Sequence, residues 1–224
     1  MLLPLGCGTG RHLGILSPIP PGGHFPRQEG PPPSTLESLE QAPVIRRNHP
    51  SFNAVAADGS RPALDQLRSL VDQGFARLYA TQAEAEEALG GQVLPSPAGG
   101  HRQNAPWRGE KHRLIQDLRR NAVNALVRIL ERQVLPRFSD HAADLAAASA
   151  AGEVETFILD FMHAFMTIPA ADAEARWNCC LIEAPIRRSR PALDSEEPVS
   201  GMFLVWRVLG FGGKAYPLLY ARVP

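Results

Sequence analysis

A short apolar run that ends in an aspartate is the feature of this sequence best suited to metal chemistry. Phe157, Ile158 and Leu159 lead to Asp160, and Phe161 follows it. Phosphoryl transfer with two divalent metal ions requires carboxylates that a rigid element holds at the metals. An apolar strand would anchor the backbone, so Asp160 is a candidate metal ligand and catalytic residue. The alternative is a carboxylate that caps a short helix, which is the commoner role of an isolated Asp.

A basic segment precedes this run. Residues 101–137 carry nine Lys or Arg against three Asp or Glu, whereas the whole chain has 23 of each class. Lys111 and Arg113 alternate along residues 111–117, which are predicted to form a strand. The planar guanidinium of Arg can hold phosphate oxygens at two points. The pattern suits a phosphate-bearing ligand, and the alternative is a basic face exposed to solvent.

Three segments, in this order, resemble the reverse transcriptases of gypsy-like long-terminal-repeat retrotransposons. Residues 111–119, followed by Asn121 and Asn124, are similar to the fingers signature, in which a basic strand leads to Asp-aromatic-Arg and then Asn. Residues 157–169 are similar to palm motif A, which is an apolar strand with an Asp, an aromatic residue and Ile-Pro. Residues 203–220 are similar to motif B, a strand that leads through a glycine-containing turn into a helix.

The chain departs from the family pattern at three positions. His112 stands where an aromatic residue is usual, Gly210 replaces the usual Pro, and Tyr216 replaces a small residue before Pro217. Each motif alone also fits a structural interpretation, such as a packed strand, turn and helix for the third. Their order and spacing favour the resemblance over residues 107–223.

The resemblance implies roles for individual residues. Asp160 would bind two Mg²⁺ ions, and the backbone carbonyl of Phe161 would assist one of them. Arg113 would grip the triphosphate of the incoming nucleotide, and the ring of Phe165 would exclude a ribose 2′-hydroxyl. The nucleotide-binding positions that it implies are Lys111, Arg113, His163, Ala164, Phe165, Phe211 and Gly212.

The activity implied by the resemblance is RNA-directed DNA polymerisation, with an RNA or DNA template-primer and a deoxynucleoside triphosphate as partners. In the family, two aspartates on a later hairpin complete the metal site, but no Asp or Glu follows Glu197 here. We therefore expect a retroelement fragment with the fingers and the first half of the palm, inactive alone and unable to hold Mg²⁺ tightly. The alternative is a non-catalytic nucleic-acid-binding remnant whose basic fingers hold a template or primer.

The glycine-rich start suggests a less favoured alternative. Residues 5–13, Leu-Gly-Cys-Gly-Thr-Gly-Arg-His-Leu, are similar to the glycine-rich loop of S-adenosylmethionine-dependent methyltransferases. Such a loop needs a strand before it and a helix after it. Pro4 precedes it, and Pro18 and Pro20 leave little room for a helix. The context therefore indicates a coincidental match.

The expected fold class is α+β, a partial right-hand polymerase with fingers helices and an incomplete antiparallel palm sheet. Residues 1–50 contain ten Pro and seven Gly, a composition typical of disordered segments. We therefore expect a disordered tail over 1–60, outer-fingers-like helices and a loop over 61–110, and a fingers and palm fragment over 111–224. Helices are expected near 61–75, 81–90, 122–134, 139–150 and from 214, a loop over 92–109, and strands over 111–117, 154–161, 176–183 and 202–209.

Composition says little about the compartment. Cys7, Cys179 and Cys180 provide neither a disulfide framework nor zinc-ligand spacing. No apolar run approaches the roughly 20 residues that cross a bilayer. Residues 1–6 lack the basic start and long apolar region of a signal peptide. We expect an intracellular protein of the cytoplasm or nucleus without a membrane partner.

Overall fold

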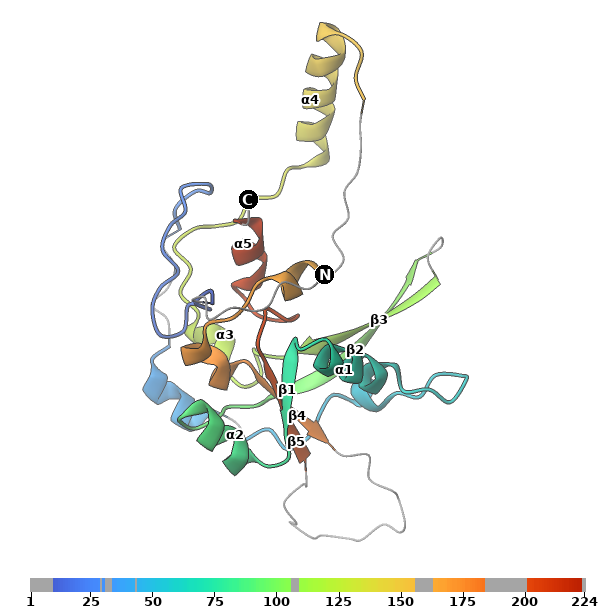
Figure 1. Cartoon of the computed structure of the whole chain (residues 1–224). Helices are drawn as coiled ribbons and strands as arrows, with labels where there is room; N and C mark the ends of the chain where they lie inside the picture. The colour runs from blue at the N-terminus through green and yellow to red at the C-terminus, as the bar shows by residue number, and fades with distance from the viewer. Residues whose placement is uncertain are drawn as a thin grey trace.

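The computed structural model describes residues 10–28, 30, 34–42, 44–105, 109–155, 163–183 and 201–222 of the chain. They form a mixed α+β fold around a five-stranded sheet (Figure 1), so the expected α+β class is confirmed in this coarse form. The strands are β1 (Ala76–Tyr79), β2 (Ser96–Ala105), β3 (Gly109–Gln116), β4 (Cys179–Glu183) and β5 (Gly201–Trp206). The α-helices are α1 (Pro62–Asp72), α2 (Gln82–Leu89), α3 (Val123–Leu126), α4 (Phe138–Ala151) and α5 (Tyr216–Ala221). Short 3-10 helices are η1 (Leu36–Gln41), η2 (Pro50–Asn53), η3 (Ala164–Thr167) and η4 (Asp172–Trp177).

The sheet has the strand order β1-β5-β4-β2-β3. β5 lies antiparallel between β1 and β4, while β2 and β3 form a long antiparallel hairpin. A short parallel contact at Ser96 joins β2 to β4, so the sheet is mixed. The predicted strands near 176–183 and 202–209 are confirmed as the neighbours β4 and β5. The strand predicted over 154–161 lies outside the described residues from residue 156 onward.

Side chains of the central strands alternate between two covered faces. On one face, Leu204 and Trp206 of β5 pack with the even-numbered residues of β4 against α1. On the other face, Phe203 and Val205 pack with the odd-numbered residues of β4 against α2 and η4. The period of two is that of an extended strand. Because both faces are buried, these strands are continuous apolar runs in the sequence.

The first two helices agree with their local signals. Leu67 and Leu70 of α1 are buried, as the helical repeat predicts. α2 begins after Thr81, whose side-chain oxygen accepts the backbone N–H of Glu84 at 3.1 Å. It ends at Gly90, whose φ of 67° lies in the left-handed region that glycine adopts without strain. Both predicted helices are confirmed to within a few residues.

The loop predicted over 92–109 is wrong, because most of it forms β2. Pairing with β3 supplies the backbone hydrogen bonds that local composition did not suggest. Gly100 lets the strand pass close to η2, since a Cβ there would lie 2.8 Å from the Ser51 carbonyl oxygen. Glycine within a strand often marks such a close approach. β2 is therefore stabilised by pairing with its neighbours rather than by the intrinsic β-propensity of its residues.

The helix predicted over 122–134 is also shorter than expected. It is limited to the four residues of α3, and the chain beyond it is extended. Ile129 and Glu131 of this extended segment form bridges with Ile19 and Arg27 of the N-terminal segment. Backbone groups that would continue the helix bond instead to another part of the chain.

Residues 10–28 correct the expectation of an unpacked tail over 1–60. Leu13, Ile15 and Ile19 are buried in one cluster with side chains of α3 and α5. Backbone hydrogen bonds also join this segment to the chain that follows α3. The Pro- and Gly-rich composition is an average over 50 residues. It therefore does not reveal that three apolar side chains of this segment pack against residues far away in the sequence. No helix follows Gly10 as the methyltransferase alternative requires, because residues 11–28 contain only bridges and bends.

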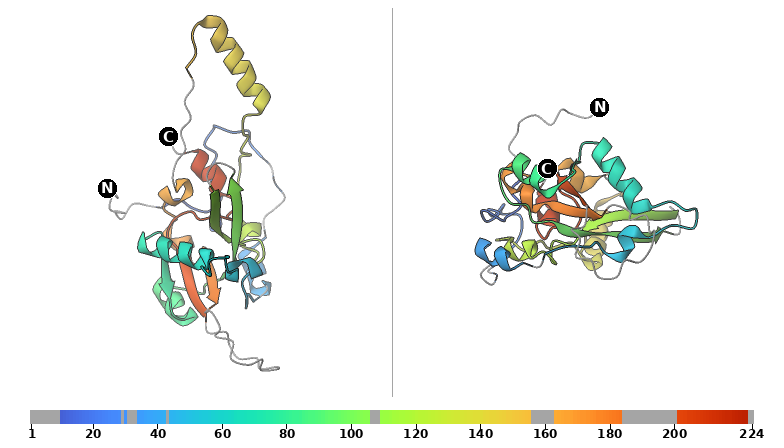
Figure 2. Two further views of the ribbon diagram at one scale, coloured as in Figure 1. Left: turned by 90° about the vertical axis from the view of Figure 1, so that its right-hand side faces the viewer. Right: turned by 90° about the horizontal axis from the view of Figure 1, so that it is seen from below.

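α4 extends away from the sheet and the other helices (Figure 1 and the left view of Figure 2). It is the predicted alanine-rich helix, and none of its residues is buried. The expected cap Ser139 is replaced by Arg137, whose backbone N–H donates to the Asp140 carboxylate at 2.8 Å. The helix boundary was predicted from local sequence, whereas its exposure depends on the rest of the fold.

Tyr216, which stands where the resembled pattern has a small residue, is accommodated by its surroundings. Its hydroxyl donates to the Asn178 side-chain oxygen at 2.7 Å, and the ring is buried. Gly213 leaves room for the ring, since a Cβ there would lie 2.2 Å from it. Pro217 falls in the first turn of α5, where its missing N–H costs no helical hydrogen bond. The helix predicted from Lys214 onward is confirmed.

Candidate functional site

Three side chains that the sequence singled out meet at one end of β3. The Arg113 guanidinium carbon lies 5.5 Å from the centre of the Phe211 ring, which is within the range of a cation–π contact. The Phe165 ring meets Phe211 edge-on, with 5.6 Å between the ring centres. Arg113 belongs to β3, Phe165 to η3, and Phe211 to the loop after β5. We call Arg113, Phe165 and Phe211 the aromatic–arginine site.

Phe165 is held in place from its other side by α5. The centre of the Tyr220 ring lies 5.5 Å from the centre of the Phe165 ring, and the two planes are nearly perpendicular. All three rings are half-buried, so each keeps part of its surface open. Such partly exposed rings can stack on a flat ligand. The site thus combines a cation with apolar, flat surfaces.

The loop after β5 is fastened to β3 by backbone contact. The Gln116 N–H donates to the Phe211 carbonyl at 2.8 Å. A Cβ on Gly212 would lie only 1.9 Å from the Gln116 carbonyl oxygen, and its φ of 120° disfavours other residues. Glycine at this position is therefore required by the close approach of the two segments.

Asn124 of α3 closes the other side of this loop. Its side-chain nitrogen donates to the Gly212 carbonyl at 3.0 Å, and its side-chain oxygen accepts the Lys214 N–H at 2.9 Å. The neighbouring Asn121 is buried and donates to the Leu94 carbonyl at 2.9 Å. Both asparagines of the fingers signature therefore organise backbone. The role of Asn124 in positioning the loop could not be read from spacing alone.

Two polar groups beside the loop have no hydrogen-bond partner among the described residues. They are the side-chain amide of Gln116, whose oxygen and nitrogen atoms are both buried, and the side-chain Nε of Arg113. A buried polar group that lacks a partner costs free energy. Both residues belong to β3, where side chains alternate between the two faces of the strand. The Gln116 amide therefore lies on the buried face with Leu114, and Arg113 lies on the opposite face.

The other expected nucleotide-binding residues are arranged less closely. Lys111 is exposed on β3, two residues from Arg113 and on the same face of the strand. His163 adopts a left-handed backbone with φ of 57°, and its ring faces Phe75 at 5.8 Å between centres. Ala164 begins η3. The structure thus brings Arg113, Phe165 and Phe211 together, while the side chains of Lys111 and His163 lie apart from that contact.

Asp160 and Phe161 lie outside the described residues, so the expected Mg²⁺ ligand has no described position. Within the described ranges, no three His, Cys, Asp or Glu side chains gather as a metal ion would require. Asp117 of the fingers signature is engaged with protein, since it contacts the His49 ring nitrogen at 3.0 Å and accepts the Arg120 N–H at 3.1 Å. No step through a metal ion is derived from these residues.

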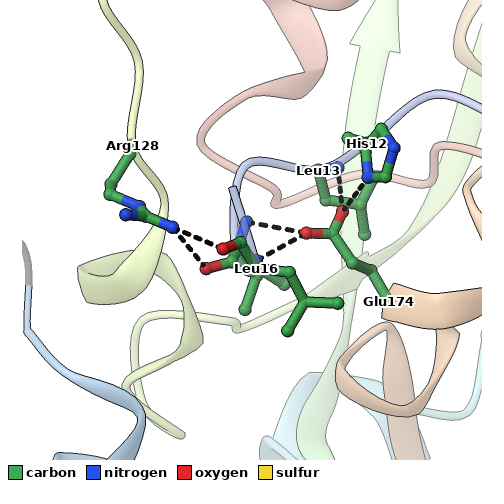
Figure 3. A network of polar contacts seen from close by, with 6 residues as sticks. His12, Leu13, Leu16, Arg128 and Glu174 are labelled. Carbon is green, nitrogen blue, oxygen red and sulfur yellow. Dashed lines mark hydrogen bonds and ion pairs between the residues drawn. The ribbon is translucent and has the colours of Figure 1, made fainter. Parts of the chain in front are cut away.

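A buried carboxylate outside the aromatic–arginine site is structural. Glu174 of η4 accepts backbone N–H groups of Leu13, of Ile15 at 3.0 Å and of Leu16 at 2.7 Å (Figure 3). Arg128 approaches the same turn from the opposite side, and its Nη2 donates to the Leu16 carbonyl at 2.6 Å. The Glu174 carboxylate thus accepts three backbone N–H groups, and the His12 ring nitrogen lies 3.9 Å from it. The sequence offered no local signal for this contact, because its partners lie about 160 residues apart along the chain.

Glu131 is a second buried carboxylate that fastens the N-terminal segment. It accepts the Gly23 N–H at 2.6 Å and pairs with the Arg222 guanidinium at 2.7 Å. Burial by itself would raise the pKa of Glu131, but the hydrogen bonds from Arg222 and Gly23 and the charge of Arg222 lower it below its ordinary value. The residue is thus a charged anchor between the two ends of the described chain.

The buried thiols are poor candidates for nucleophiles. Cys179 and Cys180 are completely buried in β4. Burial raises the pKa of the Cys180 thiol to about 11 and that of Cys179 well above its ordinary value. Since the thiolate is the reactive form, neither is prepared for catalysis.

Comparisons with known proteins leave the family open. No family model matches this sequence, and no curated protein matches it at a significant level. Within the described part of the chain, none of the helices combines the length and apolar character needed to span a bilayer. The chain is therefore characterised by its own geometry: a mixed α+β fold that joins Arg113, Phe165 and Phe211 at the end of β3.

Proposed function

We propose that this chain is a part of a retroelement reverse transcriptase, in which the aromatic–arginine site holds a nucleotide or the paired end of a template-primer. The chain alone is proposed to bind without synthesis, because the resemblance supplies a single carboxylate, Asp160, for a reaction that uses several. A site with one metal-binding carboxylate would lack most of the ligands that two ions need.

The observation that carries the proposal is the contact of Arg113 with Phe211 and of Phe211 with Phe165. The three residues come from segments separated by more than 40 positions, and the resemblance in sequence implies a nucleotide-binding role for each of them. Arg suits phosphate oxygens, and half-buried rings suit stacking on sugar or base.

Binding of a labelled template-primer tests this proposal. Fluorescence anisotropy of the full chain with a short DNA primer on an RNA template should show binding that weakens as salt increases, since phosphate contacts release counterions. Arg113→Ala should weaken binding about tenfold, the effect of losing one or two charge-assisted contacts. Arg68→Ala is the matched control, because Arg68 is an exposed arginine of α1 that pairs with Asp65. Equal binding by both variants would refute the assignment of Arg113.

A non-catalytic nucleic-acid-binding remnant is the second candidate function. The basic hairpin formed by β2 and β3 favours it, since Arg102 and Lys111 are exposed along its length. The two candidates differ in their need for a nucleotide. Added deoxynucleoside triphosphate that stabilises the complex with a template-primer would favour the polymerase-type site, whereas indifference to it would favour the remnant.

A further inference from the structure

A cavity formed by the described residues lies away from the aromatic–arginine site. It has a volume of about 610 Å³, and neither Arg113 nor Phe211 lines it. Its walls are the N-terminal segment, the extended chain after α3, and the start of α5. The volume falls within the range of sites that hold a small organic molecule.

The cavity exists because the N-terminal segment wraps around it. The Ile19 N–H donates to the Arg128 carbonyl at 3.0 Å, and the Gln28 N–H donates to the Leu130 carbonyl at 2.9 Å. The Ser34 N–H donates to the Ala125 carbonyl at 3.3 Å. These contacts fix the rim at three places along the extended chain. The space between them is therefore part of the folded structure.

Positive charge dominates the wall. Arg128, Arg132 and Lys214 line the cavity, and none of them forms an ion pair with a carboxylate in the described part of the chain. Lys214 uses one Nζ donor on the Val127 carbonyl at 3.1 Å, which leaves two donors. Among the described residues of the wall, Glu131 is the one acidic side chain, and it is already paired with Arg222. An anion that enters thus meets three cations of the described wall, and the described carboxylate is already engaged.

The remaining wall is apolar. Val127, Ile129, Pro217 and Leu218 line the same space. A flat or aliphatic group could contact them while an anionic group reaches the cations. Arg is well suited to phosphate because its planar fork can donate two hydrogen bonds to one group.

We propose that this cavity binds a small phosphorylated molecule with a flat apolar part, of about the size of a nucleoside monophosphate. The phosphate contacts Arg128, Arg132 and Lys214, and the apolar part lies against Pro217 and Leu218. This site is independent of the proposed function, since it shares no residue with the aromatic–arginine site.

Isothermal titration calorimetry of the full chain with AMP, adenosine and inorganic phosphate tests the proposal. AMP should bind more tightly than either of the others, because only AMP offers both the anion and the ring. Binding of inorganic phosphate as tight as that of AMP would overturn the inferred ligand class. The absence of AMP binding would overturn the site itself.

Variants of the wall locate the binding. Combined Arg132→Gln and Lys214→Met should weaken AMP binding about tenfold or more, the loss expected for two charge-assisted contacts. Arg68→Ala, on exposed α1, should leave it unchanged. Ala125→Phe, at an exposed position of the rim, should also block AMP by filling the space while leaving every cation in place. AMP binding that survives both the double variant and Ala125→Phe, in proteins with unchanged thermal unfolding, would overturn the proposal.

Discussion

The guanidinium of Arg113 lies 5.5 Å from the centre of the Phe211 ring, although the two residues are almost 100 positions apart. The contact joins β3 to the loop that follows β5, and the hydrogen bond from Gln116 to Phe211 fixes the same two segments. A change in either segment must therefore affect the other. Several of the predictions below depend on such contacts between distant segments.

Gly212→Ala should destabilise the protein by about 2 kcal/mol or more and should separate the loop from β3. The new Cβ would lie 1.9 Å from the Gln116 carbonyl oxygen, on a backbone whose φ of 120° is already unfavourable. Urea unfolding followed by tryptophan fluorescence measures the change. Gly59→Ala is the control, because its φ of 81° is also positive but a Cβ there would have no atom within 4 Å. Equal losses in the two variants would show that the close contact is unimportant.

Glu174→Gln should lower the free energy of unfolding by about 1–3 kcal/mol, because an amide replaces one acceptor with a donor that faces backbone N–H groups. Hydrogen exchange of the Leu13, Ile15 and Leu16 amides should become faster in the variant. Glu153→Gln, at an exposed position after α4, is the matched control. Unchanged protection of the three amides would contradict the anchoring role of Glu174.

Acid should weaken the attachment of the N-terminal segment through Glu131. Its pKa in the folded protein is lowered, so its contribution is present above the ordinary value of 4.5 and is lost as the pH falls through the folded value. The difference in thermal stability between the native protein and Glu131→Gln should thus be constant near pH 7 and shrink below pH 4.5. Arg222→Met should reduce the same difference at pH 7. A difference that grows with acidity would refute this assignment.

A fusion of the chain to a complete palm and thumb of the resembled family should synthesise DNA with magnesium, whereas the chain alone should not. In the fusion, Asp160→Asn should abolish primer extension, because it removes an anionic metal ligand at nearly constant shape. Phe165→Ala should retain extension but admit ribonucleotides. Arg113→Ala should mainly raise the nucleotide concentration required. Extension that survives Asp160→Asn would defeat the assignment of motif A.

Local signals were sufficient for part of the fold. The cap at Thr81 and the left-handed Gly90 predicted the ends of α2, because both act within a few residues of the chain. β2 could not be predicted in this way, since its glycines make sense only beside Ser51 of η2. The burial of Ile19 was hidden for the same reason. Its partners follow α3, more than 100 positions later.

The candidate site was likewise predictable from the sequence only in part. Residue types and spacing singled out Arg113, Phe165 and Phe211, because each motif carries its own short pattern. Their mutual contact, and the part that Gln116 and Asn124 play in holding the loop, depend on how three distant segments cross. A single sequence contains no period or spacing that reports such a crossing.

The contacts that join the N-terminal segment to Arg222 have a consequence for synthesis on the ribosome. Arg222 donates to the Pro20 carbonyl at 2.8 Å and pairs with Glu131, which itself holds Gly23. The segment around Pro20 therefore cannot close these contacts until Arg222, about 200 positions later in the chain, has been made. Contacts of such long sequence separation form late, because a large loop must first be closed. Until then the buried side chains of residues 13–19 are open to water, chaperones and proteases, so a translational pause before codon 222 prolongs the period in which the nascent chain is vulnerable.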